Sequence, residues 1–440
     1  MDQQYAFAIA EREYLLRTKK SREMYKAAQR VMPGGDTRTT VFFSPYPITV
    51  NSGGGPELQD IDGNRYLDFL NNYTSTIHGH AHPKILQKVN HALTFGTSYA
   101  SVIEEQITLA EILSERVPGI QRVRFCNSGS EATMFAIRAA RAFTNRAGLI
   151  KMDGGYHGTH ETVQSEFSSA QQAPVSMGIP VHVTQDVYVV PFNDLEAVER
   201  LLIQRANEIA AILVEPVMGA AGVIPPQPGY LTGLRELANK YDVILIFDEV
   251  QTLRLSTGGA QSKYQVTPDL TALGKIIGGG FPVGAYGGRA DIMSLFDPAQ
   301  SKPLSHGGTF NGNRITMVAG IASMELLDEQ AITHLDKLGQ RLESRMLETI
   351  ERFAVPASIT RAGSLLNVHF TVTPPIDYSS THSSCKDLAK LLHLELLNRG
   401  IYTAPRGMWN LSTVMTEIHI DQAVEAFSDS MQLIAKCLQQ

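Results

Sequence analysis

The sequence is poor in cysteine, and its few cysteines are scattered. Cys126, Cys385 and Cys437 lie far apart and form no CxxC pair. This spacing does not suit a disulfide framework, and it leaves no set of thiolates for a structural zinc ion. Reduced thiols in a cytoplasm fit the pattern better, so we expect a cytoplasmic protein.

Long apolar runs and strong charge are also missing. No apolar stretch is long enough to span a bilayer, and the charged segment Met1 to Lys20 lacks the apolar core of a signal peptide. A net charge of −6 argues against nucleic acid as the main partner. Hydrophobic residues make up 43% and charged residues 19%, a composition typical of a globular protein. We therefore expect neither a membrane nor a nucleic acid as a partner.

The chain of 440 residues is too long for one ordinary core, so more than one domain is expected. Its middle alternates short apolar runs with helical patterns. Strands that are apolar on both faces and separated by helices imply a mostly parallel sheet covered on both sides. The predicted strands are Leu149–Met152, Ala211–Val214 and Val243–Phe247, and the predicted helices are Glu131–Phe143, Leu195–Ala206 and Pro228–Tyr241.

The two ends of the chain read as a mixture of helices and strands. A helix is predicted over Glu11–Val31 with a stop at Pro33–Gly35, and a hairpin over Glu57–Leu70 around the turn Asp62-Gly63. The C-terminal part is predicted to contain helices over Ile315–Leu327, Leu335–Phe353 and Lys386–Asn398, strands near Leu365–Val372, a loop from Pro374 to Ser384, and a last helix after Asp421.

Lys275 lies among apolar and glycine residues, in the run Thr271–Gly280. Partial desolvation lowers the pKa of an amine and frees it to act as a nucleophile. Such a lysine is suited to form a Schiff base with an aldehyde, which suggests an enzyme that uses pyridoxal 5'-phosphate (PLP) as an electron sink.

Two acids follow predicted strands. Asp248 ends the most apolar strand, and Glu215 follows Ala211–Val214. Ligands bind beyond the carboxyl ends of such strands. A buried carboxylate needs a cationic or hydrogen-bonding partner, and the protonated nitrogen of a pyridine ring would supply one. A structural ion pair or helix cap would satisfy Asp248 equally well.

Two further motifs have both a structural and a functional interpretation. Ser128, Gly129 and Ser130 open a predicted helix, where they can cap it or bind a phosphate. Tyr156 and His157, in Gly154–Gly158, follow a strand, and the tyrosine ring could stack on a flat cofactor or lie half-buried in a turn.

Other motifs favour no metal or nucleotide site. The segment His78–Pro83 contains three histidines, but Gly79 and Pro83 indicate a turn and no carboxylate follows at ligand spacing. The glycines of 278–288 form no GxGxxG motif. Lys275 lacks the upstream glycine and the Ser or Thr that accompany the lysine of a P-loop. The segment Ser305–Phe310 places the Thr309 hydroxyl next to two glycines. This hydroxyl could donate to a phosphate, or the segment could be an ordinary loop.

The chain resembles the class III aminotransferases in an ordered set of motifs. In order along the chain, these motifs are Asn127–Ala132, Tyr156–Gly158, Asp248–Val250, Lys275 and Gly308-Thr309. This resemblance covers nearly the whole chain. It implies the α/β fold of fold-type I PLP transferases, with a large domain over 76–325, an N-terminal segment over 1–75 that joins the small domain, and a C-terminal small domain over 326–440.

The resemblance points to two subfamilies. Thr267–Arg289 and Met32–Gly35 are similar to glutamate-1-semialdehyde 2,1-aminomutase. The segments around Arg38 and Arg406 look like β-phenylalanine and related β-amino-acid aminotransferases, in which arginines at the matching positions contact the substrate carboxylate. The run Thr252–Leu255 is one residue shorter than in many class III sequences, as it is in the β-phenylalanine enzymes, and it leaves the role of Arg254 open.

The resemblance also implies roles for individual residues. Lys275 carries the cofactor and moves the substrate proton, and Asp248 keeps the pyridine nitrogen protonated. Val250 and Tyr156 pack on the two ring faces, and Arg38 and Arg406 anchor carboxylates. Thr309 would reach the phosphate of a neighbouring subunit, which implies a homodimer with shared active sites. The remaining cofactor contacts would come from Ser128, Gly129, Ser130, His157 and Glu215.

We therefore expect an aminotransferase that acts on a β-amino acid, aromatic in character, with an α-keto acid such as 2-oxoglutarate or pyruvate as acceptor. The alternatives are an aminomutase of the glutamate-semialdehyde type, an aminotransferase that acts on a carrier-bound β-keto acyl chain, and a PLP-binding protein without catalysis. A thioester-bound chain would leave a carboxylate-binding arginine unused, and an intact set of Lys275, Asp248 and Tyr156 speaks against a merely binding role.

Overall fold

The computed structural model describes residues 2–166, 173–174 and 176–439. Within these residues the largest sheet has seven strands in the order β4-β12-β11-β10-β9-β5-β8. Strand β12 runs antiparallel to both of its neighbours, and the other neighbouring pairs are parallel. The strands are β4 (Arg122–Cys126), β5 (Gly148–Met152), β8 (Val187–Val190), β9 (Ile209–Val214), β10 (Ile244–Asp248), β11 (Leu270–Gly274) and β12 (Gly284–Gly288).

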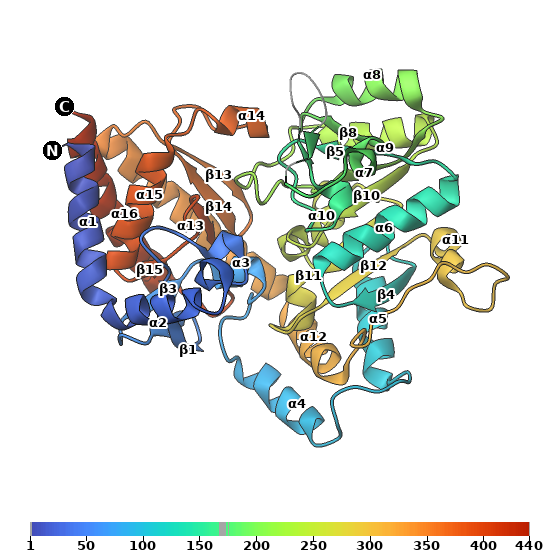
Figure 1. Ribbon diagram of the computed structural model, residues 1–440, viewed down its shortest axis with the longest axis horizontal. Coiled ribbons are helices and arrows are strands. Elements are labelled where there is room, and N and C mark those ends of the chain that lie inside the picture. Colours follow the sequence, from blue (N-terminus) through green and yellow to red (C-terminus); the bar gives the residue numbers. More distant parts are fainter. Residues whose placement is uncertain (1, 167–172, 175, 440) are drawn as a thin grey trace.

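Helices cover both faces of this sheet, because its strands are apolar on both sides (Figure 1). Helix α6 (Gly129–Thr144) packs on the face that carries Leu213 and Ile246. Helices α8 (Leu195–Arg205) and α9 (Tyr230–Lys240) pack on the opposite face, which carries Ile212 and Leu245. The α/β architecture with a mostly parallel, doubly covered sheet is therefore confirmed.

The sequence did not predict the strand that lies within the glycine-rich segment 278–288. Gly284 to Gly288 form β12, which lies buried between β4 and β11. Glycine is required at Gly284, since a Cβ there would lie 2.0 Å from the carbonyl oxygen of Ser128. Gly284 thus serves close approach of the backbone of β12 to Ser128.

The two ends of the chain pack side by side, as the blue and red ribbons at the left of Figure 1 show. Strand β15 (Ile401–Tyr402) pairs with β3 (Arg65–Asp68), next to β2 (Glu57–Asp60) and β1 (Val50–Gly54). A second sheet contains β13 (Ser358–Ala362), β14 (Leu365–His369) and β16 (Met408–Asn410). The flanking helices are α1 (Gln3–Arg17), α2 (Lys19–Gln29), α13 (Glu329–Phe353), α15 (Lys386–Asn398) and α16 (Glu417–Leu438).

The helix predicted over Glu11–Val31 begins earlier and is broken at Thr18. Thr18 has φ −121° and ψ 42°, outside the helical region. Its buried hydroxyl lies 3.0 Å from the Tyr46 hydroxyl and donates to the Tyr14 carbonyl at 2.6 Å. A tertiary contact therefore decides where α1 ends and α2 begins. The predicted loop from Pro374 to Ser384 also differs, because it contains the short helix α14 (Tyr378–Thr381).

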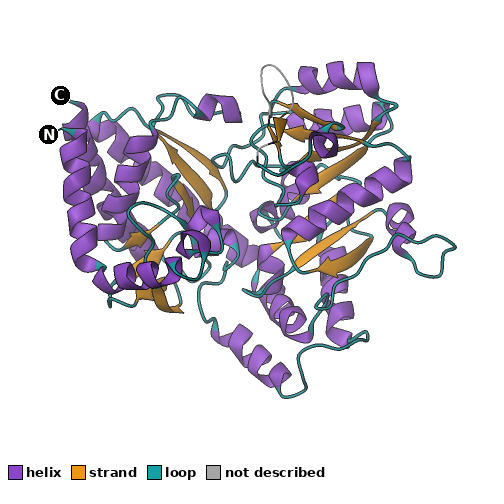
Figure 2. Cartoon of the chain, viewed as in Figure 1, coloured by secondary structure: helices purple, strands orange, loops and turns teal. Residues whose placement is uncertain are grey.

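The remaining elements complete the structure, and Figure 2 shows how helices and strands are distributed in the molecule. The further helices are α3 (Asn71–Thr74), α4 (Pro83–Leu93), α5 (Glu104–Arg116), α7 (Val181–Thr184), α10 (Gly259–Tyr264), α11 (Ala290–Met293) and α12 (Arg314–Leu326). Short 3-10 turns span Pro33–Gly35, Thr39–Val41, Glu161–Val163, Thr252–Leu255, Lys275–Gly278 and Ser294–Phe296, and β6 (Ser165–Glu166) pairs with β7 (Ala173–Pro174).

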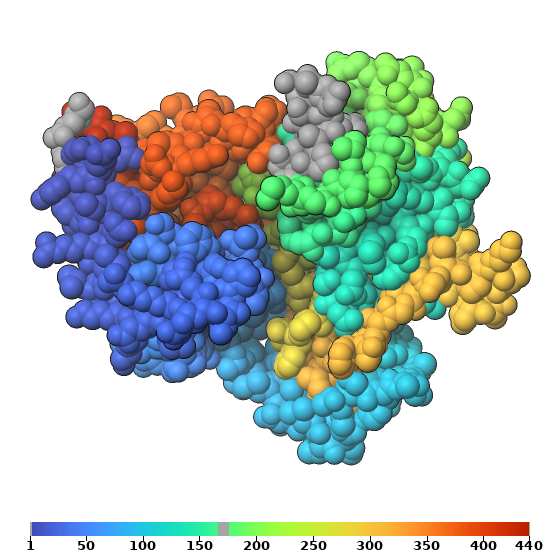
Figure 3. All heavy atoms as spheres, viewed as in Figure 1, coloured from blue at the N-terminus to red at the C-terminus, as the bar shows by residue number. Residues whose placement is uncertain are grey.

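Figure 3 shows the ends of the chain forming one side of the molecule and the residues around the large sheet forming the other. A loop after α11 projects from the right edge of this view. Among the helices of the described residues, none has the length and apolar character that crossing a membrane requires.

Candidate active site

A cavity of about 570 Å³ lies at the carboxyl ends of the parallel strands. Asp248 ends β10, Glu215 follows β9 directly, and Lys275 follows β11 directly. Parallel strands bring these positions to one edge of the sheet, although they are far apart in the sequence. The lining residues include Arg38, Thr40, Asn72, Tyr73, Ser128, Gly129, Ser130, Tyr156, His157, Glu215, Asp248, Val250, Gln251, Lys275, Phe281 and Arg406.

Asp248 is buried in this cavity, at 4% exposure, and both of its oxygens have partners. His157 Nδ1 lies 2.8 Å from Asp248 Oδ2, and the Val250 amide donates to Oδ1 at 3.1 Å. The other ring nitrogen, His157 Nε2, is buried and has no hydrogen-bond partner among the described residues. The imidazole therefore fixes the direction of the Asp248 carboxylate and keeps it beside a polar neighbour.

Lys275 is half-buried in the cavity and has a backbone φ of 49°. A left-handed conformation is unfavourable for a lysine, and such strain is found at functional sites. Burial lowers the pKa of the Lys275 amine to about 8, while the carboxylates of Asp248 and Glu215 oppose this shift. The amine thus carries an appreciable neutral fraction near neutral pH, which the sequence had predicted.

Glu215 is a buried acid at the same edge. Its Oε1 accepts from the Tyr156 amide at 2.9 Å, and its Oε2 accepts from the Gly219 amide at 3.1 Å. Burial raises the pKa of this carboxyl, and His157 acts in the opposite direction. Glu215 therefore holds the loop that carries Tyr156 in place.

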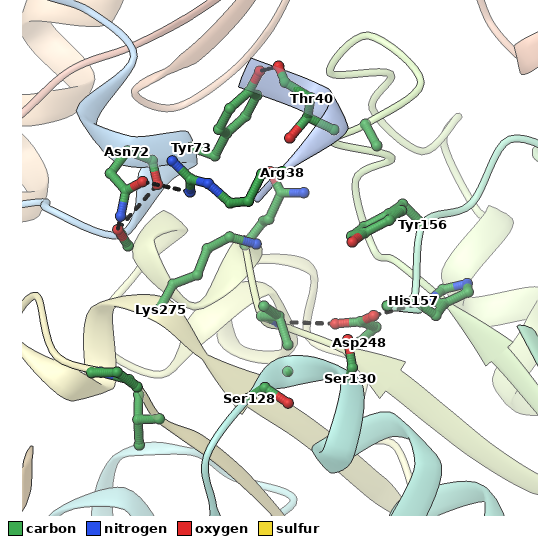
Figure 4. A pocket seen from close by; sticks show the side chains of 18 of the residues that line it. Arg38, Thr40, Asn72, Tyr73, Ser128, Ser130, Tyr156, His157, Asp248 and Lys275 are labelled. Carbon is green, nitrogen blue, oxygen red and sulfur yellow. Dashed lines mark hydrogen bonds and ion pairs between the residues drawn. The ribbon is translucent and has the colours of Figure 1, made fainter. Parts of the chain in front are cut away.

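The first turn of α6 faces the cavity from below in Figure 4, where Ser128 and Ser130 are labelled. Ser128 caps the helix, since its Oγ accepts from the Glu131 amide at 3.1 Å. The first amide groups of a helix have no partner within it, and the helix dipole favours an anion there. Gly129 lets this turn pack closely against Val250, because a Cβ at this position would lie 3.0 Å from the Val250 side chain.

Two exposed arginines, Arg38 and Arg406, also line the cavity. Arg38 Nη1 donates to Asn72 Oδ1 at 2.8 Å. The guanidinium carbon of Arg406 lies 5.5 Å from the centre of the Tyr73 ring. Among the described residues, no ion pair includes Arg38 or Arg406, so both charges remain available to an anionic ligand.

Every site residue predicted from the sequence lines this one cavity, except Thr309. Thr309 is exposed on the loop before α12, beside a shallow groove that His306, Gly308 and Asn311 help to line. Arg254 lies outside the cavity at 1% exposure, where its Nε donates to Ser364 Oγ at 3.0 Å and its Nη2 donates to the Leu411 carbonyl. Arg254 thus joins the 3-10 turn Thr252–Leu255 to the C-terminal part of the chain.

The sequence did not single out Thr40, Asn72, Tyr73, Gln251 or Phe281 as lining residues. One signal was present for Asn72, since Asn71-Asn72 is a pair of residues that tolerate left-handed backbone.

Two histidines of the segment 78–82, His78 and His80, have hydrogen-bonding partners. His78 lies 2.9 Å from Thr413 Oγ1 and 2.9 Å from the Ser323 carbonyl, and His80 Nε2 lies 2.7 Å from Asp68 Oδ2. In the ranges that the structure describes, no cluster of histidine, cysteine and acidic residues has the geometry to hold a metal ion.

Comparison with known proteins identifies the family of the chain. The family model of the class III aminotransferases matches residues 42–435. Glutamate-1-semialdehyde 2,1-aminomutase of Desulforamulus reducens is 39% identical over 427 residues, 95% of this chain and 98% of that protein.

Two solved structures are similar along almost the whole chain. An omega-transaminase from Sphaerobacter thermophilus is 44% identical, with a TM-score of 0.91 over 94% of this chain and 97% of that one. A β-phenylalanine aminotransferase from Variovorax paradoxus is 38% identical, with a TM-score of 0.91 over 97% of each chain. The chain therefore belongs to the class III aminotransferases, enzymes that use pyridoxal 5'-phosphate.

Proposed function

We propose that this enzyme transfers an amino group from an aromatic β-amino acid to an α-keto acid such as 2-oxoglutarate or pyruvate. The observation that carries this proposal is the pair of guanidinium groups, Arg38 and Arg406, at one side of a cavity that contains a lysine of lowered pKa. A guanidinium binds a carboxylate through two parallel hydrogen bonds. The similarity to a β-phenylalanine aminotransferase supports the same assignment.

The donor groups of the cavity fit the three ends of PLP. The first turn of α6, at Ser128, Gly129 and Ser130, offers amide and hydroxyl groups to the phosphate. Asp248 offers a buried carboxylate to the pyridine nitrogen, and Lys275 offers its amine to the aldehyde. When bound, PLP supplies an electron sink for the charge that develops on the substrate carbon.

The other residues of the cavity position these groups. In our proposal His157 orients the Asp248 carboxylate through their 2.8 Å contact, and Glu215 orients Tyr156 through its backbone amide. Val250 and Tyr156 would hold the cofactor ring between them. The neutral Lys275 amine would accept the proton from the substrate carbon and then donate it again, a general acid–base role.

We propose a homodimer in which Thr309 contributes to the phosphate site of the neighbouring copy. Thr309 is exposed and outside the cavity of its own chain. Around its loop lie large apolar side chains with unusual exposure, namely Val102 at 71%, Phe310 at 59% and Ile107 at 52%. Exposed apolar patches of this kind mark surfaces that a partner covers.

A mixture of variants tests this shared site. Lys275→Ala and Thr309→Ala are each expected to lower activity. Dimers that contain one copy of each variant keep one site with both residues intact. Co-expression should therefore restore about half of the wild-type activity per mixed dimer, and no restoration would mean that Thr309 serves its own chain.

We also propose a domain division at about residues 75 and 325, with the ends of the chain forming the small domain. The pairing of β15 with β3 supports it. A cytoplasmic location is proposed as well, supported by the three unpaired cysteines, of which Cys385 is exposed.

The aminomutase is the second candidate, and the 39% identity to one such enzyme favours it. An aminomutase keeps the amino group on the same substrate and needs no acceptor. The two candidates therefore differ in whether a donor alone converts the cofactor and whether a keto acid is required for turnover.

The test is to add single donors to the PLP-loaded enzyme without a keto acid and to follow the visible absorbance of the cofactor. We expect β-phenylalanine to bleach the band and 2-oxoglutarate to restore it. If β-phenylalanine leaves the band unchanged and glutamate 1-semialdehyde is isomerised without an acceptor, the enzyme is an aminomutase.

A further inference from the structure

The turn Asn71–Thr74, which we call the left-handed turn, has an unusual backbone. Its residues have φ values of 46°, 47°, 52° and 77°, so four consecutive residues other than glycine lie in the left-handed region. This conformation brings Cβ close to the following carbonyl oxygen, and it is least suited to a β-branched residue such as Thr74. Backbone of this kind persists when the surrounding structure holds it in place.

Buried hydrogen bonds hold the left-handed turn. Asp68 Oδ1 accepts from the amides of Leu70 and Asn71, each at 2.8 Å. Asn71 Nδ2 donates to the Asn410 carbonyl at 2.9 Å, and Asn410 Nδ2 donates to the Leu70 carbonyl at 2.7 Å. The turn is therefore fixed to both β3 and β16, which come from opposite ends of the chain.

Consecutive residues of the left-handed turn contact the two arginines, and Figure 4 shows Asn72 bonded to Arg38. Asn72 Nδ2 donates to Ser75 Oγ at 2.9 Å, which leaves Asn72 Oδ1 to accept from Arg38. The Tyr73 ring lies against the Arg406 guanidinium, and the Tyr73 hydroxyl donates to the Thr40 carbonyl. Tyr73 thus also fixes the segment that follows Arg38.

Both contacts leave the arginine charges unneutralised. An amide oxygen and an aromatic ring attract a guanidinium, but neither cancels its charge. An Asp or Glu in either place would form an ion pair that a substrate carboxylate would have to displace. The left-handed turn thus orients two cations and keeps them available.

We propose that Asn72 and Tyr73 are positioning residues for carboxylate binding, and that the left-handed turn places them so that Arg38 and Arg406 act together. This inference rests on the proposed role of the two arginines as carboxylate anchors. The ligand class is a carboxylate on an amino or keto acid. The turn acts through the arginines and not on the cofactor, so it governs substrate affinity and leaves the rate at saturation unchanged.

Two substitutions at Asn72 separate its side chain from its backbone. Asn72→Gly removes the amide but suits a positive φ, so the fold should remain as stable as in the wild type. Asn72→Asp keeps the shape and places a negative charge against Arg38. The matched control is Asn145→Gly, the same change at the left-handed cap of α6, where φ is 54° and the residue is exposed away from the cavity.

Tyr73 has its own pair of variants. Tyr73→Phe keeps the ring against Arg406 and loses the hydroxyl bond to Thr40, whereas Tyr73→Leu loses both contacts. The aromatic contact is therefore tested by the difference between these two variants.

The measurement is calorimetric titration of the PLP-loaded enzyme with 3-phenylpropanoate and with glutarate, which carry carboxylates but no amine or ketone that can react. We expect Asn72→Gly and Tyr73→Leu to raise the Kd about fivefold, the effect of one modest contact. Asn72→Asp should raise it further, since the added charge competes with the ligand. Tyr73→Phe should weaken binding less than Tyr73→Leu, and Asn145→Gly should bind as the wild type does.

The half-reaction with β-phenylalanine provides the second readout, in which the variants should raise the saturation constant and keep the limiting rate. Unchanged Kd values in Asn72→Gly and Tyr73→Leu, or no wild-type binding of either carboxylate, would overturn the inference. Wild-type affinity in Asn72→Asp would show that neutrality is not required. Failure of β-phenylalanine to react, with the carboxylate titrations as expected, would refute the proposed donor and leave the role of the turn intact.

Discussion

Gly284→Ala offers a test that links the glycine-rich strand β12 to the cofactor site. A Cβ at this position would lie 2.0 Å from the Ser128 carbonyl oxygen, 2.5 Å from the Ser128 carbonyl carbon and 2.7 Å from Cys126 Sγ. Because Ser128 caps α6, any movement that relieves this overlap changes the first turn of that helix. The substitution therefore perturbs the proposed phosphate site from behind, without changing any residue that lines it.

The size of the effect follows from the overlap. Nonbonded carbon and oxygen atoms rarely approach closer than 3 Å, so Ser128 has to move by roughly 1 Å, and a displacement of that size in an active site can cost about 100-fold. Overpacking of a buried site costs about 1–3 kcal/mol of unfolding free energy. Replacing a glycine stiffens the unfolded chain and offsets about 0.4–1 kcal/mol of that loss.

The assay is titration of the apoprotein with PLP, together with denaturant unfolding of the same samples. We expect Gly284→Ala to lower the free energy of unfolding by about 1–2 kcal/mol and to weaken PLP binding at least tenfold. Gly54→Ala is the matched control, because Gly54 also lies in a strand at negative φ and has nothing within 4 Å of an added Cβ. PLP affinity in Gly284→Ala within twofold of that of the control would refute the link between β12 and the first turn of α6.

Three further predictions concern charge and pH. Arg406→Ala should raise the KM for the keto acid and the β-amino acid about tenfold or more by steady-state kinetics, because a charge-assisted hydrogen bond is lost, and unchanged constants would exclude the anchor role. Asp248→Asn should still bind PLP but lower the single-turnover rate about 100-fold, the effect of one preorganised charge, and a near-normal rate would exclude its role at the pyridine nitrogen. Burial lowers the pKa of His393 to about 3, below its unfolded value of about 6.5. The neutral imidazole therefore contributes to the free energy of unfolding above pH 6.5, and this contribution is lost as the pH falls, by about 2 kcal/mol at pH 5. His393→Leu should remove that share of the acid lability in denaturant unfolding at pH 7 and pH 5, and an unchanged pH dependence would contradict the assignment.

The sequence by itself determined three neighbouring strands of the seven-stranded sheet and the position of the main chemical groups. Continuous apolar runs predicted β5, β9 and β10, and the helical patterns predicted α6, α8, α9 and α15 to within a few residues. Because the carboxyl ends of parallel strands share one edge, these predictions were enough to bring Asp248, Glu215 and Tyr156 to one site. All of this depends on local periodicity, which a sequence contains directly.

Only the tertiary structure decided the contacts between distant segments. The contact of His157 with Asp248 joins residues 91 positions apart, and the fixing of the left-handed turn by Asn410 joins residues 339 positions apart. The antiparallel place of β12 and the break at Thr18 likewise depend on neighbours from elsewhere in the chain. Such contacts override local preference, because burial and hydrogen bonding to distant residues outweigh the propensity of a short segment. The sequence therefore indicated the chemistry of this enzyme, and the packing of its two ends decided how Arg38 and Arg406 are held in the cavity.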